Sequence, residues 1–173
     1  LLRETISDIE IVLFKTHSNY PFYNFINRNN IKDVLKSRNI DFKDVIFHVR
    51  GEILAWHLSE VLGANYYKNI LPDVRGAGVE EIEEFSDSNI VLKSLKIINN
   101  KKAIKNLNKF HKMSVVSNSL KEYLINNYNI DQEKIVVTPC LAGPGFRYND
   151  IIRESTRKEL NLSKEDKVIV FSS

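Results

Sequence analysis

The stretch DVIFHVRGEILAWHLSEVL, residues 44–62, is the clearest indication of the fold class. Its first part, residues 44–49, is rich in Val, Ile and Phe, as expected for a strand that is covered on both faces. A helical pattern over residues 51–63 follows immediately. A strand that leads directly into a helix is the unit from which parallel sheets are built.

The same alternation of strand and helix patterns runs along the rest of the chain. Further strands are predicted at 9–14, 65–71, 113–117, 134–138 and 167–172, and helices at 20–29, 31–38, 79–85, 91–111, 119–127 and 152–160. In the helix at 119–127, Ser119 and Glu122 have the spacing of a capping box, with Ser119 as N-cap. We therefore predict a Rossmann-like, doubly wound α/β domain with a mostly parallel sheet and helices on both faces.

The bulk composition is that of a globular protein. The 173 residues suffice for one full domain, and 43% are hydrophobic and 27% charged. The single cysteine, Cys140, excludes an internal disulfide and a cysteine-built zinc site. No apolar run approaches the roughly 18 residues that span a bilayer, and the opening LLRETISDIE lacks a signal-peptide pattern. We expect a cytoplasmic protein.

The end of the chain predicts a change of domain. Residues 138–150, TPCLAGPGFRYND, hold two of the four prolines and two of the six glycines, which is typical of a linker. We predict a first domain over residues 1–138, a linker and helix over 139–165, and the first strand of a second domain over 166–173. The absence of an initial Met and the final apolar strand lead us to expect a piece of a longer protein.

Charge is distributed unevenly. No Asp or Glu occurs between Ser88 and Lys121, and five acidic residues lie just before this segment. Four lysines of the predicted helix at 91–111 are candidates for a peripheral contact with anionic lipid at the inner face of the membrane: Lys101, Lys102, Lys105 and Lys109. The alternative is that the helix packs its apolar side on the sheet and leaves the lysines in water. Nucleic-acid binding is not expected, because basic and aromatic residues do not interleave.

Polar residues follow two predicted strands where a parallel α/β sheet binds its ligands. His48, Arg50 and Gly51 end one strand, and Asp73, Arg75 and Gly76 end the next. The arginines could donate to an anionic or polyhydroxyl ligand, and the glycines would let the backbone approach it. The alternative is that Asp73 pairs with Arg75 or caps the turn, while the glycines supply positive φ angles.

Other motifs carry less information. The glutamates of VEEIEEF, residues 79–85, could include a general base, although such residues more often oppose a helix dipole. His57 is interpreted as structural, and His17 is a site candidate by position alone. The histidines show no metal-binding spacing, and the glycine and serine motifs of dinucleotide-binding domains, P-loop NTPases and α/β hydrolases are absent. No metal site is predicted.

The order of these pieces resembles the N-terminal domain of retaining group 1 glycosyltransferases with the GT-B fold. The resemblance is carried by VIFHVRG, by PDVRG with the acidic VEEIEEF, by MSVVSNSLKEYL, and by KIVVTPC followed by Phe146. The closing RKELNLSKEDKVIVFSS is similar to that family's linker into its second domain. The chain departs from the family pattern in lacking a glycine-rich loop after residues 9–14 and in carrying Cys140 and Leu141 where many members have Asn-Gly.

The resemblance implies the acceptor-binding half of a bacterial hexosyltransferase. Such an enzyme moves a sugar from a nucleotide-sugar to a saccharide or lipid-linked acceptor in the assembly of cell-surface polysaccharide or glycolipid. The acceptor would contact Asp73, Arg75, Gly76, Arg50, Gly51 and His48, while the C-terminal domain would bind the donor without a metal. This chain alone would be inactive and hold no catalytic residue. Two alternatives are a GT-B-like sugar-nucleotide epimerase and a non-catalytic α/β module that docks on an anionic membrane or an acidic partner.

Overall fold

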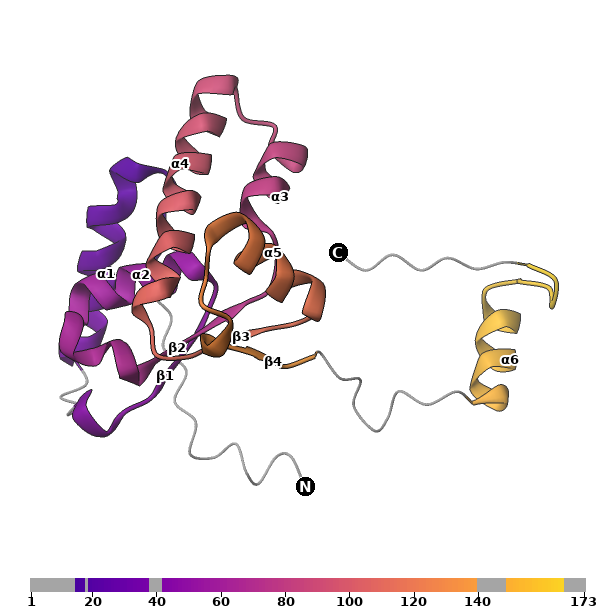
Figure 1. The fold of residues 1–173 in the computed structure, drawn as a ribbon. Coiled ribbons are helices and arrows are strands. Elements are labelled where there is room, and N and C mark those ends of the chain that lie inside the picture. Colours follow the sequence, from indigo (N-terminus) through magenta and orange to yellow (C-terminus); the bar gives the residue numbers. More distant parts are fainter. Residues whose placement is uncertain (1–14, 18, 38–41, 140–148, 167–173) are drawn as a thin grey trace. The chain divides into compact units, whose positions relative to one another are not determined.

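The computed structural model describes residues 15–17, 19–37, 42–139 and 149–166. The chain divides into two compact units, Leu1–Pro139 and Cys140–Ser173. Figure 1 shows the ribbon of both units, and each is described here by itself.

A parallel sheet forms the centre of the first unit. The described strands are paired in the order β1-β2-β3-β4 and all neighbours are parallel. Their bounds are Phe47–Arg50 for β1, Ile70–Val74 for β2, Met113–Val115 for β3 and Ile135–Val137 for β4. The strands predicted at 9–14 and 167–172 lie outside the described residues.

Helices flank the sheet (Figure 1), which confirms the Rossmann-like α/β class. The first unit contains α1 (Asn24–Ser37), α2 (Glu52–Leu62), α3 (Gly78–Phe85), α4 (Ile90–Asn106) and α5 (Asn118–Tyr128). Short 3-10 helices occur at η1 (Pro21–Tyr23), η2 (Phe42–Asp44), η3 (Ala64–Asn69), η4 (Leu107–Lys109) and η5 (Gln132–Lys134).

The hydrophobic core lies between one face of the sheet and the helices. Alternate strand residues, such as Val49 and Val74, belong to the same buried cluster as Leu58 of α2, Ile104 of α4 and Leu124 of α5. The pairing register brings Arg50, Asp73 and Ser114 side by side across β1, β2 and β3. Because the side chains of a strand alternate between its faces, this polar row lies opposite the apolar one.

Three local predictions were wrong. Residues 20–29 and 31–38 form a short 3-10 turn and the single helix α1, because the backbone continues in the helix through Asn30. Helix α5 is capped by Ser117, whose Oγ accepts from the Leu120 amide at 3.1 Å. Ser119 lies inside the helix, because Ser117 already has the extended conformation that an N-cap requires.

The third wrong prediction is the strand over residues 65–71. Residues 64–69 form η3, and the strand begins only at Ile70. The buried Asn69 side chain donates to the carbonyl oxygens of Lys43 and Val45 at 3.1 and 2.9 Å. These bonds hold the turn against the segment that precedes β1, so the apolar tyrosines of the predicted strand lie in a helical turn.

The second unit contains α6 (Asp150–Glu159). Asn149 caps it by accepting from the Ile152 amide at 3.0 Å. Arg157 donates to the carbonyl oxygens of Ser163 and Asp166 and so holds the turn that follows the helix.

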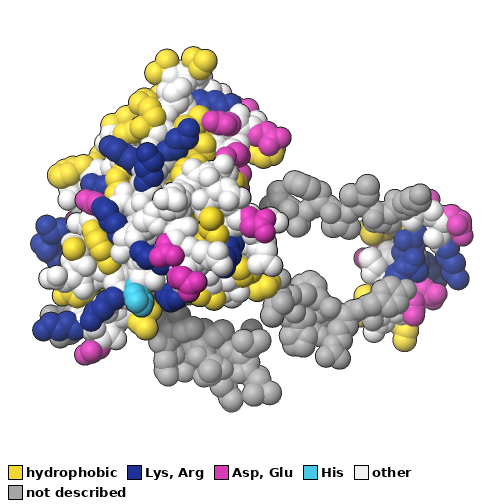
Figure 2. Space-filling view, viewed as in Figure 1, with side chains coloured by type: hydrophobic (Ala, Val, Ile, Leu, Met, Phe, Trp, Pro, Cys, Tyr) yellow, Lys and Arg dark blue, Asp and Glu magenta, His cyan; other side chains and the backbone are white. Residues whose placement is uncertain are grey.

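One part of the surface of the first unit is hydrophobic. Figure 2 shows hydrophobic side chains gathered at its upper end, where Figure 1 places the turn between α3 and α4. Phe85, Ile90 and Val91 are exposed there. None of the helices in the described part of the chain combines the length and the apolar character needed to cross a membrane.

Candidate functional site

A large cavity of the first unit lies where β1 ends and α2 begins. Its volume is about 890 Å³. The walls come from the first two turns of α2, from α3, and from Lys96 and Asn100 of α4, with Asn27 and Ile31 of α1 and residues 16, 17 and 19 completing them. This is the carboxyl end of a parallel strand, where open α/β sheets bind their ligands.

Of the six residues predicted to bind the acceptor, only two line this cavity. Arg50 and Gly51 line it, and His17, the candidate by position, does so too. His48 lies two residues before Arg50 in β1. It lines a smaller apolar cavity of about 190 Å³, which Arg50 also lines. Asp73, Arg75 and Gly76 are not among the described residues that line the large cavity. The contact of all six residues with an acceptor stays a prediction.

Asp73 makes bonds within the protein through both carboxylate oxygens. Arg75 Nε donates to Oδ2 at 2.6 Å, and Ser114 Oγ donates to Oδ1 at 2.9 Å. Burial alone would raise the pKa of Asp73, but these two bonds and the positive charges of Arg75 and His48 outweigh it, so the pKa lies below its ordinary value. The structure thus shows the pair that the alternative interpretation predicted.

The two arginine-glycine ends need glycine for different reasons. Gly51 has φ +90°, which side chains rarely adopt, and its amide donates to the Asp73 carbonyl at 2.9 Å. Gly76 is not among the described glycines with positive φ. A Cβ at Gly76 would instead lie 2.0 Å from Oε1 of Glu81, so the missing side chain makes room for that carboxylate.

Carboxylates and an amide surround Gly78 on the cavity wall. A Cβ at this glycine would meet Oε1 of Glu52 at 2.9 Å and Oδ1 of Asn100 at 3.0 Å. Both oxygens therefore lie close against the start of α3. Burial, and then the charge of Glu81, raise the pKa of Glu52 above its ordinary value, while a backbone hydrogen bond lowers it. Glu52 is consequently a carboxyl group that takes up a proton more readily than an exposed glutamate does.

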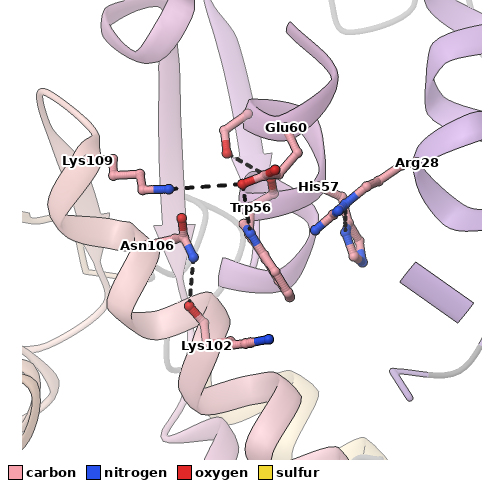
Figure 3. A network of polar contacts seen from close by, with 8 residues as sticks. Arg28, Trp56, His57, Glu60, Lys102, Asn106 and Lys109 are labelled. Carbon is pink, nitrogen blue, oxygen red and sulfur yellow. Dashed lines mark hydrogen bonds and ion pairs between the residues drawn. The ribbon is translucent and has the colours of Figure 1, made fainter. Parts of the chain in front are cut away.

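His57 lies in α2 with its ring fixed on two sides. Figure 3 shows the Arg28 guanidinium directed at the ring, with Nε donating to His57 Nδ1 at 3.3 Å. The Trp56 ring stacks on the imidazole with centroids 5.3 Å apart. Burial and then the charge of Arg28 lower the pKa of His57 to about 4, against a smaller opposing effect of Glu60. The imidazole is therefore neutral near pH 7, with its proton on Nε2.

The predicted lysine surface is interspersed with acidic groups. Lys101 and Lys105 line a second cavity, of about 560 Å³, together with Glu80 and Glu83. Lys109 Nζ lies 4.0 Å from Oε1 of Glu60, a contact visible in Figure 3. The carbonyl oxygen of Lys102 accepts from Asn106 Nδ2 at 2.9 Å. A lipid contact through these four lysines stays a prediction.

Sequence reasoning missed Glu52, His57 and Asn100 as cavity residues. His57 was interpreted as structural because it lies in an amphipathic helix, and Asn100 lies in a helix where the lysines, not the asparagines, suggested a function. A signal was available for Glu52, which follows Arg50 and Gly51 directly. Within the described ranges, no group of three or more His, Cys, Asp or Glu side chains is placed to hold a metal ion.

Comparison with known proteins identifies a similar fold. No family model and no curated protein matches the chain. Among solved structures, a crystal structure of a glycosyltransferase from Rickettsia africae ESF-5 is similar over 95% of this chain, with a TM-score of 0.50 and 22% sequence identity. The chain spans 40% of the length of that structure. The protein therefore has an α/β fold similar to a part of a glycosyltransferase.

Proposed function

We propose that this chain is the acceptor-binding part of a glycosyltransferase with the GT-B fold. The acceptor would bind in the large cavity at the end of β1 and be a saccharide, either free or lipid-linked. The likeness to a glycosyltransferase fold supports the general class. The position of the cavity at the carboxyl end of a parallel strand supports its use as a binding site.

One observation carries the proposal: the cavity presents hydrogen-bonding groups of both kinds around an open space of about 890 Å³. Glu52, Glu81 and Asn100 offer acceptor oxygens, and Arg50 and Lys96 offer donors. Sugars present hydroxyl groups that both donate and accept, so a mixed lining of this kind suits them. Gly51 adds no side chain at the start of α2 and so leaves the first turn of that helix open to a ligand.

The finer features of the reaction follow from the resemblance in the sequence. A nucleotide-sugar would be bound by a further domain of the same protein, in keeping with the 40% of the neighbour's length that this chain spans. We propose hexosyl transfer with retention, no metal, and a role in bacterial cell-surface polysaccharide or glycolipid assembly in the cytoplasm. Basic side chains and helix dipoles would then stabilise the leaving nucleotide.

The test is acceptor-dependent transfer by the full-length protein. A panel of nucleotide-sugars and hexoside acceptors is incubated with the enzyme, and the products are identified by mass spectrometry. Arg50→Ala should raise the acceptor KM about tenfold, because a charged donor is lost, and leave the donor KM nearly unchanged. Lys36→Ala is the matched control, because this exposed cation on α1 is not among the described residues that line the large cavity.

Three results would contradict the proposal. Failure to transfer any sugar across the panel would remove the glycosyltransferase assignment. Conversion of the nucleotide-sugar to its epimer without an acceptor would favour the epimerase alternative. A rise of the donor KM in Arg50→Ala would place this residue on the donor side.

A further inference from the structure

We propose that His57 and Asn100 form a subsite in the large cavity that selects acceptors by their neutral hydroxyl groups. The inference rests on the proposed function and adds to it the residues and the chemistry of recognition. It is carried by two buried polar atoms without hydrogen-bond partners among the described residues, on two residues from different helices that line the same cavity.

The first atom is Nε2 of His57. The side chain is 3% exposed, and Nε2 has no hydrogen-bond partner among the described residues. Arg28 occupies the other ring nitrogen, so the neutral ring carries its hydrogen on Nε2. Stacking against Trp56 keeps the ring in place. His57 therefore presents one N–H donor that the protein itself does not use.

The second atom is Oδ1 of Asn100. The residue is 4% exposed, and this oxygen also lacks a partner among the described residues. It lies against the start of α3, where a Cβ on Gly78 would come within 3.0 Å of it. Oε1 of Glu52 lies beside the same glycine. Glycine at position 78 thus leaves room for two acceptor oxygens.

The combination of groups decides which ligand fits. A buried polar atom that is left unpaired destabilises the protein, so a ligand that pairs both atoms is bound with that free energy recovered. An ammonium group would satisfy Asn100 Oδ1 but offers no acceptor to His57 Nε2–H. A carboxylate or phosphate would satisfy His57 but repel Glu52 and Glu81. Hydroxyl groups both donate and accept, carry no charge, and so suit both partners.

The neighbouring residues supply a built-in comparison. Asn99, next along α4, is equally buried, but Asn24 donates to its Oδ1 at 2.8 Å and its Nδ2 donates to the Asn19 carbonyl at 3.2 Å. Asn106 has a buried, unpaired Oδ1 but does not line the cavity. Asn99 is thus paired within the protein. Asn106 and Asn100 each have an Oδ1 without a described partner, and of these two residues only Asn100 lines the cavity.

The test combines thermal unfolding with ligand binding in the full-length protein. The probes are methyl hexopyranosides and their monodeoxy derivatives, and binding is followed by saturation-transfer NMR. Asn100→Leu should raise the melting temperature of the free protein while weakening glycoside binding about tenfold. Asn99→Leu should lower the melting temperature, and Asn106→Leu should leave binding unchanged.

His57→Phe tests the donor. It keeps an aromatic ring against Trp56 but removes Nε2–H, and it should weaken binding of the parent glycoside about tenfold. A deoxy probe that lacks the hydroxyl group bound by His57 Nε2–H should bind wild type and His57→Phe equally. Discrimination between a parent glycoside and that deoxy form should therefore be lost in the variant.

The outcomes separate the subsite from the proposed function. If glycosides bind but His57→Phe and Asn100→Leu bind them as wild type does, the subsite is wrong while the acceptor cavity stands. A fall in the melting temperature of Asn100→Leu equal to that of Asn99→Leu would also overturn the subsite, as would the absence of any glycoside binding. A protein that binds glycosides through these residues but transfers no sugar would retain the subsite and lose the transferase assignment.

Discussion

Two polar regions of the first unit differ in how their groups are used. At the end of β2, Asp73 accepts from Arg75 and Ser114 through its two carboxylate oxygens. Beside β1, His57 and Asn100 line the large cavity, and their buried Nε2 and Oδ1 atoms have no described partner. The first region pairs its polar groups internally, and the second leaves them for a ligand.

A residue that is conspicuous in the sequence is therefore not always available to a ligand in the structure. An aspartate and an arginine two residues apart attract attention, yet that spacing also lets them bind each other. A histidine and an asparagine buried in helices attract none. Pairing within the protein, which only the structure shows, distinguishes a residue that holds the fold from one that can hold a ligand.

We expect the strongest effect from His57, a cavity residue, which should make the free energy of unfolding depend on pH. The pKa of His57 falls from 6.5 in the unfolded chain to about 4 in the folded protein, so the unfolded chain binds more protons between these values. The free energy of unfolding should therefore decrease as the pH falls from 6.5 to about 4, by about 3 kcal/mol from this residue. Urea unfolding across this range measures the decrease.

His57→Phe is the control, because it removes the titrating group and should flatten this part of the curve. The raised pKa of Glu52 acts in the opposite sense: its folded form holds the proton more tightly, so its contribution to stability declines as the pH rises through the window above its ordinary value of 4.5. Identical pH curves for wild type and variant would show that His57 is not buried as neutral imidazole.

A smaller effect is expected at the paired region. Asp73→Ala should lower the free energy of unfolding by about 2 kcal/mol near pH 7, because Ser114 Oγ and Arg75 both lose a charged partner. Arg75→Ala should cost about 1 kcal/mol, since its side chain is 41% exposed. Equilibrium unfolding in urea measures both values.

The pH dependence of the same variant sharpens the test. The pKa of Asp73 lies below its ordinary value of 3.8, so its carboxylate stabilises the fold above that pH, and the stabilisation is lost as the pH falls through the folded pKa. The difference in the free energy of unfolding between wild type and Asp73→Ala should therefore decrease as the pH falls below 3.8. A variant as stable as wild type near pH 7 would remove the distinction between the two regions.

The smallest effect is expected at the lysines of α4. Lys101 and Lys105 share a cavity with Glu80 and Glu83, whose negative charges oppose attraction to an anionic surface. The double variant Lys101→Glu/Lys105→Glu should therefore change binding to anionic phosphatidylglycerol vesicles less than about twofold in co-sedimentation. Binding by wild type that the double variant abolishes would instead support the predicted lipid contact.

Much of the first unit could be predicted from residue patterns. The strands at β1, β3 and β4 and the helices α2, α3 and α5 follow directly from apolar periodicity and from the placement of Gly and Ser. The segment 64–69 could not be predicted, because its tyrosines are typical of a strand. Its helical turn depends on Asn69 bonding to carbonyl oxygens more than twenty residues away, a tertiary contact that local propensity does not contain.

The candidate site was predicted only in part. Arg50 and Gly51 could be found because a strand end is a recognisable position in a sequence. Asn100 could not, because its role depends on α4 packing beside α2 and on the space left by Gly78 of α3. Asn99 and Asn100 are identical in type and adjacent, and only the direction of each side chain separates a structural amide from a candidate ligand.

The bonds of Asp73 also bear on how the sheet is assembled. Its carbonyl accepts from Gly51 at the end of β1, and its side chain accepts from Ser114 of β3, so one residue joins three adjacent strands. A slip of β2 by one position would turn this carboxylate toward the face that carries Pro72 and Val74. An ionised group there would be too costly to bury, so misaligned sheets are disfavoured. The contacts of Asp73 therefore favour the observed register of β2 over a register shifted by one residue.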